Sequence, residues 1–192
     1  MSENERTRTK IIEAATRLFS CNGYYNTKVS DIVKEAAVAQ GTFYLYFKTK
    51  EEVFHFLVMD YLGKLEDVVQ KNIQVKDSVA SQSAPPAKDV FNYYYNLFHD
   101  LLMIYFENKS IWWITVRDGM NFSKLTAIHT SFKERLAHLL ICHYPDEKMA
   151  YASIGMVAEL TFTWFYIRKK GVESVPELAR TLAEIHIKLL ES

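Results

Sequence analysis

The chain has 192 residues, of which 49% are hydrophobic and 24% are charged, a composition that is typical of a folded globular protein and excludes a disordered one. The longest run without a charged side chain, residues 36–47, has 12 residues and is too short for a membrane span, which needs about 18 apolar residues. The first residues are polar, and Cys21 and Cys142 lack metal-ligand spacing, so we expect a cytoplasmic protein without secretory signal, metal or cofactor.

Charge is distributed unevenly, although the chain as a whole has no net charge. Residues 1–50 carry eight basic and five acidic side chains, a net charge of +3, and the remainder carries −3. A basic N-terminal quarter on an acidic body favours a polyanionic partner at one end of the chain.

The first half of the chain predicts four helices, because glycine and proline are scarce and apolar residues recur at helical spacing. The first helix ends at Asn22-Gly23, the second begins after Thr27 as its N-cap, and the third covers about residues 39–47. Thr49, followed three residues later by Glu52, predicts a capping box that opens a long fourth helix.

The second half predicts five more helices, which follow an exposed loop at residues 74–88 that has no periodicity and contains Pro85-Pro86. No segment shows the alternation of β-branched residues that a strand would need. The sequence therefore predicts an all-α fold of about nine helices. The later helices are expected at residues 89–107, 110–121, 124–144, 146–170 and 174–190.

Three short helices in about the first 48 residues, with a tight turn between the second and third, form the pattern of a helix-turn-helix DNA-binding unit. The third segment supplies amide, hydroxyl and phenol groups for bases and phosphates, and Gly41 would let nucleic acid approach the backbone closely. Lys48 and Lys50 follow where the chain would leave the groove, which suits phosphate. The expected core residues are Leu18, Phe19, Ile32, Val33, Val38 and Phe43.

At these residues the sequence resembles the tetracycline-repressor (TetR) family of bacterial transcription regulators. The resemblance runs from about Arg6 to Tyr61, and its most specific part is the run GTFYLYFKTKEE, residues 41–52. It implies a helix-turn-helix domain, residues 5–65, and a helical ligand-binding and dimerisation domain, residues 66–192. It also implies a homodimeric repressor that binds a palindromic operator in double-stranded DNA and is released by a small-molecule inducer.

Carried over position by position, the resemblance places residues of the second helix beside a phosphate, the start of the third helix near bases, and its tyrosines on phosphates. One of Tyr44 and Tyr46 alternatively packs against the long helix, because the two cannot share a face. The family's usual turn, Ala-Gly-Val-Ser, reads Ala-Ala-Val-Ala at residues 36–39. A left-handed Ala37 would cost on the order of 1 kcal/mol, and Ala39 lacks the capping hydroxyl. The expected DNA-binding residues are Thr27, Lys28, Ser30, Ala39, Gln40, Gly41, Thr42, Tyr44, Tyr46, Lys48 and Lys50.

Aromatic residues are unusually frequent after residue 74, which favours either a bulky core or a cavity for an apolar or aromatic small molecule. Two charged residues lie within apolar runs, Arg117 and Glu159. Glu159 could pair with Arg117, face a cationic ligand or lie at the rim of a dimer interface, since a buried carboxylate is costly without a partner. The expected ligand-binding residues are Tyr94, Phe98, Trp112, Trp113, Arg117, Phe122, Glu159 and Phe162.

The last two helices are expected to form the dimer, because residues 146–170 are apolar on more than one face and the last helix has the apolar spacing of a helix pair. In this hypothesis, ligand binding displaces the long fourth helix and changes the spacing of the two recognition helices. The expected dimer residues are Val157, Trp164, Leu178, Leu182, Ile185 and Leu189.

Two other classes remain as alternatives. One is an all-α enzyme with an aromatic active site, although the sequence has no nucleophile–base pattern, zinc-protease motif or glycine-rich phosphate loop. The other is a helical protein-interaction module. DNA binding would weaken steeply as salt rises, whereas an apolar protein contact would not.

Overall fold

The computed structural model describes residues 2–80, 87–118, 130–131, 133–138 and 146–190. All regular structure in these ranges is helical, which confirms the all-α prediction. The chain divides into two compact units, and residues of each come from two separate stretches of sequence. The first unit is Met1–Leu62 with Ser110–Ile128, and the second is Gly63–Lys109 with His129–Ser192.

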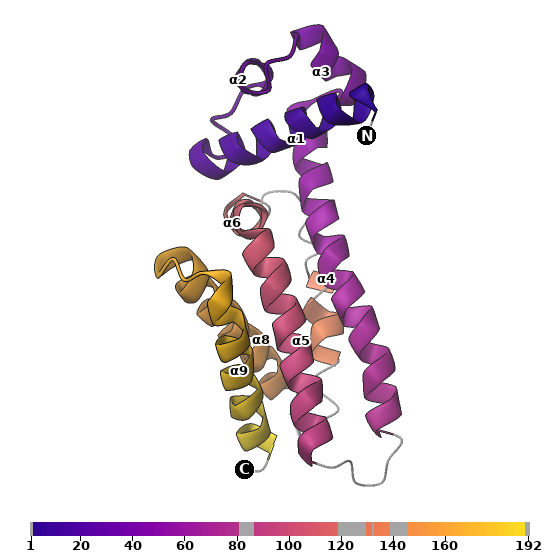
Figure 1. Ribbon diagram of the computed structural model, residues 1–192, viewed down its shortest axis with the longest axis vertical. Coiled ribbons are helices and arrows are strands. Elements are labelled where there is room, and N and C mark those ends of the chain that lie inside the picture. Colours follow the sequence, from indigo (N-terminus) through magenta and orange to yellow (C-terminus); the bar gives the residue numbers. More distant parts are fainter. Residues whose placement is uncertain (1, 81–86, 119–129, 132, 139–145, 191–192) are drawn as a thin grey trace. The chain divides into compact units, whose positions relative to one another are not determined.

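The first unit contains the three N-terminal helices, the start of a long helix and one later helix (Figure 1). Phe19, Ile32 and Phe43 are completely buried in its core, as the sequence predicted, whereas Leu18 and Val38 are half-buried. The helices are α1 (Glu3–Asn22), α2 (Val29–Glu35), α3 (Gln40–Tyr46), α4 (Lys50–Ala80), which continues into the second unit, and α6 (Lys109–Arg117).

The turn between α2 and α3 has the conformation that the sequence suggested. Ala37 has a φ of 53°, in the left-handed region where glycine is favoured. Ala39 is the N-cap of α3 and offers no side-chain hydrogen bond to that helix. At the next junction the Thr49 hydroxyl accepts a hydrogen bond from the Glu52 N–H at 3.2 Å, as expected for a helix start. The helix-turn-helix geometry therefore forms without the usual glycine and serine.

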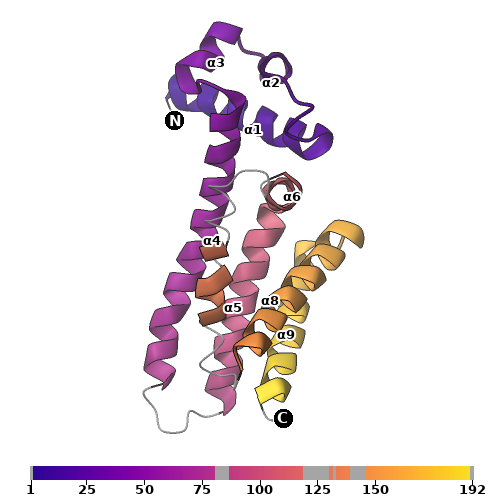
Figure 2. The same cartoon turned by 180° about the vertical axis from the view of Figure 1, so that it is seen from behind.

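The second unit is a set of long helices in which α5 and α9 pack along each other, as both views show (Figures 1 and 2). Polar pairs connect the second part of α4 to this set: Lys64 donates to Asn108 at 3.1 Å and Lys71 to Asp100 at 2.6 Å. The helices here are α5 (Ala87–Glu107), α8 (Glu147–Thr161) and α9 (Val175–Leu190), with further helical residues at 130–131 and 133–138.

Two expectations about helix bounds need correction. The loop predicted at residues 74–88 is wrong over 74–80, because α4 continues to Ala80 through a stretch without glycine or proline. The single helix predicted at 146–170 is α8 followed by a π-helical segment, Phe162–Ile167. The predicted helices at 110–121 and 124–144 lie partly outside the described residues. In the described part of the chain, no helix is long and apolar enough to cross a membrane.

His186 is a core residue of the second unit that the sequence reasoning missed. Its ring is completely buried, with the Phe98 ring centroid at 4.5 Å and the Tyr94 centroid at 5.6 Å. Its Nδ1 lies 2.7 Å from the Leu182 carbonyl oxygen. Burial lowers the pKa of His186 below its usual range, opposed by the hydrogen bond to Leu182. The folded protein therefore holds this imidazole neutral.

We expect the protein to lose stability as the pH falls below about 6.5, the ordinary pKa of histidine. In that range the unfolded chain binds a proton at His186, whereas the folded chain does not, because its pKa is lower. The free energy of unfolding therefore decreases as the pH falls. Urea unfolding at pH 8 and at pH 5.5 should show a smaller acid loss for His186→Asn than for the wild type. His55→Asn, at an exposed position of α4, is the control. Equal acid losses in the wild type and His186→Asn would contradict this assignment.

Candidate nucleic-acid interface

One face of α3 is directed away from the core of the first unit. Phe43 is completely buried and anchors the helix, whereas Gln40, Gly41, Tyr44 and Leu45 are exposed. Helical spacing places Gly41 and Leu45 one turn apart on the same outward side. The helix therefore has a buried anchoring face and an outer face with amide, phenol and apolar groups.

Three lysines lie on or next to α2 and α3 in the sequence. Lys28, Lys34 and Lys48 are exposed and enter none of the ion pairs that the described part of the chain forms. Of the nearby acids, Glu35 pairs with Arg17 at 3.0 Å, whereas Asp31 and Glu52 accept from the backbone N–H groups of Lys28 and Lys48 at 2.9 and 2.7 Å. The three ammonium groups are therefore exposed charges that the described residues do not pair.

Gly41 has no structural neighbour that would demand a glycine. A Cβ atom built at this position meets no atom of the chain within 4 Å, and the residue lies inside a helix, where glycine is less favourable than alanine by roughly 1 kcal/mol. Nothing in the described fold explains why glycine stands there. An external partner that comes close to the backbone would explain it.

Two of the expected DNA contacts form hydrogen bonds within the chain. Thr27 is completely buried, and its hydroxyl donates to the Gly23 carbonyl at 2.8 Å, so it neither caps α2 nor reaches a phosphate. The N-cap of α2 is Lys28. Tyr46 is half-buried and its hydroxyl donates to the Asn4 side chain at 3.2 Å. Of the two tyrosines, Tyr44 is the exposed one.

Lys50 is also placed differently from the expected phosphate clamp. Its Nζ donates to the carbonyl oxygens of Tyr24 at 2.8 Å, Thr27 at 2.8 Å and Tyr25 at 3.5 Å, and lies 4.3 Å from the Tyr24 ring centroid. Burial lowers the pKa of Lys50 from its usual value. Because an ammonium group has three N–H donors, Lys50 already uses them on the loop between α1 and α2.

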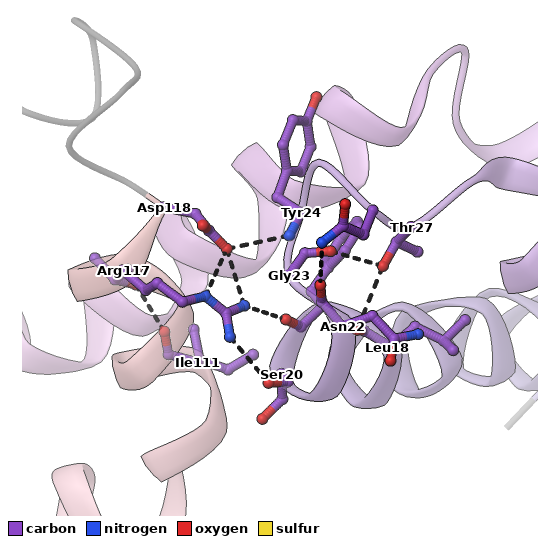
Figure 3. A network of polar contacts seen from close by, with 12 residues as sticks. Leu18, Ser20, Asn22, Gly23, Tyr24, Thr27, Ile111, Arg117 and Asp118 are labelled. Atoms are coloured by element: carbon purple, nitrogen blue, oxygen red, sulfur yellow. Dashed lines mark hydrogen bonds and ion pairs between the residues drawn. The ribbon is translucent and has the colours of Figure 1, made fainter.

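The same loop is held from its other side by the end of α6 (Figure 3). Arg117 donates to the carbonyl oxygens of Phe19 and Ser20, the latter at 3.2 Å, in the last turn of α1. That turn contains no basic residue of its own, so Arg117 supplies the cation that a helix C-terminus favours. Asp118 accepts from Arg117 at 2.9 Å and from the Tyr24 N–H at 3.1 Å.

The carboxylate that pairs with Arg117 in the structure is Asp118, whereas pairing with Glu159 was one of the three open alternatives. Glu159 is exposed on α8 and accepts a hydrogen bond from the Thr163 hydroxyl at 3.3 Å. The alternatives of a ligand counter-charge and an interface rim remain for Glu159.

The other expected ligand residues are dispersed. Tyr94 and Phe98 are buried in the core against His186, and their rings stack on each other with centroids 6.0 Å apart. Trp112 and Trp113 are half-buried on α6, in the first unit. Phe162 is half-buried and stacks on Tyr166 at 5.3 Å. Phe122 lies outside the described residues.

Three of the expected dimer residues are buried within the single chain. Val157, Leu178 and Leu182 are at most 5% exposed, so they form the core of the second unit rather than an open interface. The pattern that suggested a helix pair in α9 reflects its packing on α5. Trp164 and Ile185 are half-buried, and Leu189 is exposed.

The fold and the exposed α2–α3 face define a helix-turn-helix protein, and comparison with known proteins agrees. Residues 11–56 match the family model of bacterial regulatory proteins, tetR family. The chain is 37% identical over 75 residues to the fatty acid metabolism regulator protein of Bacillus subtilis, covering 39% of each chain. It is 27% identical over 163 residues to the uncharacterized HTH-type transcriptional regulator YhgD of Bacillus subtilis, covering 80% of this chain and 82% of that protein.

A solved transcriptional regulator of the TerR/AcrR family from Aquifex aeolicus has the same fold along almost the whole chain. The TM-score is 0.72 at 22% identity, covering 93% of this chain and 98% of that one. The N-terminal part of the chain, residues 11–56, is therefore similar to the DNA-binding domain of the TetR family, and the matched proteins are named as transcriptional regulators. The chain spans about a third to two fifths of the length of the first curated relatives that it matches.

Lys48 and Lys50 should behave differently on substitution, although both were expected to bind phosphate. Lys50→Ala removes two hydrogen bonds to half-buried carbonyls and a longer, exposed one, and should lower the free energy of unfolding by about 1–3 kcal/mol. Lys48→Ala removes an exposed side chain and should change it by less than about 0.5 kcal/mol. Urea denaturation of the two variants measures the difference. Equal destabilisation by both would show that Lys50 does not anchor the loop.

Proposed function

We propose that this chain regulates transcription by binding operator DNA through the outer face of α2 and α3. The observation that carries the proposal is Gly41. No neighbour in the described fold requires a glycine there, and the absence of a Cβ would let a DNA backbone or base edge come close. The exposed lysines Lys28, Lys34 and Lys48, which form no ion pair in the described residues, would attract phosphates. Of the residues expected to touch DNA, this proposal keeps Lys28, Ser30, Ala39, Gln40, Gly41, Thr42, Tyr44 and Lys48.

The proposal includes a homodimer on a palindromic site, in which each protomer places its α3 in a major groove. Adjacent grooves on one face of the duplex lie about 34–36 Å apart, so a twofold assembly is the natural way to present two such helices. The faces of α8 and α9 that do not pack on the core support this pairing, since Tyr151 and Leu189 are exposed there and Gly155 leaves open space. Light scattering of the protein in solution measures its mass and checks the dimer.

The regulator is further proposed to be a repressor that an apolar or aromatic small molecule releases from DNA. The aromatic residues of the second unit support this ligand class, and the name of one relative connects that protein with fatty acid metabolism. Helix α4 passes from the first unit to the second at Leu62–Gly63, so a ligand that displaces α4 would alter how the two α3 helices are spaced. Operator affinity measured with and without oleate tests this step, and equal affinities would remove oleate as the inducer.

Gly41→Ala should separate DNA binding from folding. The substitution places a Cβ on the outer face, so we expect it to weaken operator binding at least tenfold, whereas the fold should gain up to about 1 kcal/mol because alanine favours helix. The operator is obtained by selection from random duplexes with the full-length wild-type protein, and affinity is then measured by fluorescence anisotropy.

Gly63→Ala is the matched control, because Gly63 is also an exposed helical glycine with open space around its Cβ position. It should gain similar stability and keep its affinity for DNA. Unchanged affinity in Gly41→Ala, or failure of the wild type to select any duplex, would contradict the proposed function and favour a protein-interaction module.

A further inference from the structure

Leu45 is the most exposed large hydrophobic residue in the part of the chain that the structure describes, with 82% of its surface accessible. It lies in α3, where the neighbouring Phe43 is completely buried and Tyr44 is 49% exposed. The sequence reasoning did not include Leu45 among the DNA contacts. A single exposed leucine is ordinary on a protein surface, so the position of this one carries the argument.

Leu45 stands one helical turn after Gly41, on the same outward side of α3. A partner that comes close enough to use the open space at Gly41 must also cover Leu45, because residues four apart on a helix are neighbours. The first turn of α3 has no acidic residue, and the exposed Lys48 follows Leu45 by three positions. The surface that covers this leucine should therefore be negatively charged as a whole and present an apolar group where it meets the leucine side chain.

The major groove of DNA offers such a point. Its base edges display hydrogen-bond donors and acceptors, and the C5-methyl group of thymine is the apolar feature among them. A leucine side chain has no donor or acceptor, so it can distinguish bases only through this methyl group or by excluding water from polar edges. An apolar protein partner would fit the leucine but would not need the uncompensated charge of Lys28, Lys34 and Lys48.

We propose that Leu45 is a specificity-determining residue that packs on the methyl group of a thymine in each operator half-site. This inference rests on the proposed function, since it requires that α3 enters the major groove. It adds that one position of the operator is read by an apolar contact, so that thymine is preferred there for its methyl group and not for its hydrogen-bonding pattern.

Thymine-to-deoxyuridine replacement in the selected operator duplex tests the inference, because deoxyuridine lacks only the methyl group. For the full-length wild-type protein, replacement at one thymine position should weaken binding by about fourfold for each methyl lost. For Leu45→Ala, replacement at that same position should have no effect, whereas replacements elsewhere should act as in the wild type. Leu45→Met, which keeps an apolar side chain, should retain the methyl dependence.

Met59→Ala is the matched control, because Met59 is an exposed apolar residue of the first unit that lies on α4. It should bind both duplexes as the wild type does. Suppose that the wild type binds the operator and that removal of each thymine methyl group weakens Leu45→Ala as much as it weakens the wild type. The inference about Leu45 is then wrong, while the proposed function stands. If the wild type selects no duplex, the proposed function itself fails.

Discussion

The end of α1 and the loop between α1 and α2 are held in place by cations from two other helices, which donate hydrogen bonds to their backbone oxygens. Lys50 of α4 binds the carbonyls of Tyr24 and Thr27. Figure 3 shows Arg117 of α6, which binds carbonyls at the end of α1. Asp118 neutralises Arg117 and accepts the Tyr24 N–H. A turn of about six residues thereby has its buried polar groups satisfied, which fixes where α2 begins and how α3 is presented.

This arrangement distinguishes two sets among the basic residues of the first unit. Lys50 and Arg117 donate hydrogen bonds to carbonyl oxygens of the chain itself. Lys28, Lys34 and Lys48 are exposed to solvent and have no ion partner in the described residues. Charge counting along the sequence treats all five alike. Lys50 and Arg117 are therefore not available to a polyanion in the way that the exposed lysines are, so the basic composition of the chain overstates the charge that DNA can meet.

Much of the fold could be predicted from the sequence because it depends on local patterns. Apolar spacing located the core residues Phe19, Ile32 and Phe43, and the Ala-Ala-Val-Ala turn located the left-handed Ala37. The site was less predictable, since the roles of Thr27 and Lys50 depend on which backbone carbonyls come near them in three dimensions. The partner of Arg117 lies almost 100 residues away in sequence, at Phe19 and Ser20, which no local spacing indicates.

Some features that the reasoning missed did leave a signal in the sequence. His186 follows Leu182 and Ala183 at helical spacing in the buried stripe of α9, which identifies it as a core residue. Leu45 has the opposite signal, an apolar residue on the polar side of an amphipathic helix. The burial of Leu178 and Leu182 was misread as a dimer seam because an apolar stripe has the same period whether its partner is α5 or a second chain.

The salt dependence of operator binding tests the central claim most directly, because it counts the phosphates that the exposed lysines neutralise. The logarithm of the wild-type association constant should fall steeply and linearly with the logarithm of salt concentration. Single replacement of Lys28, Lys34 or Lys48 by alanine should each reduce the slope by about 0.9. A shallow slope in the wild type, or a slope that is the same in all three variants, would contradict a DNA-binding face on α2 and α3.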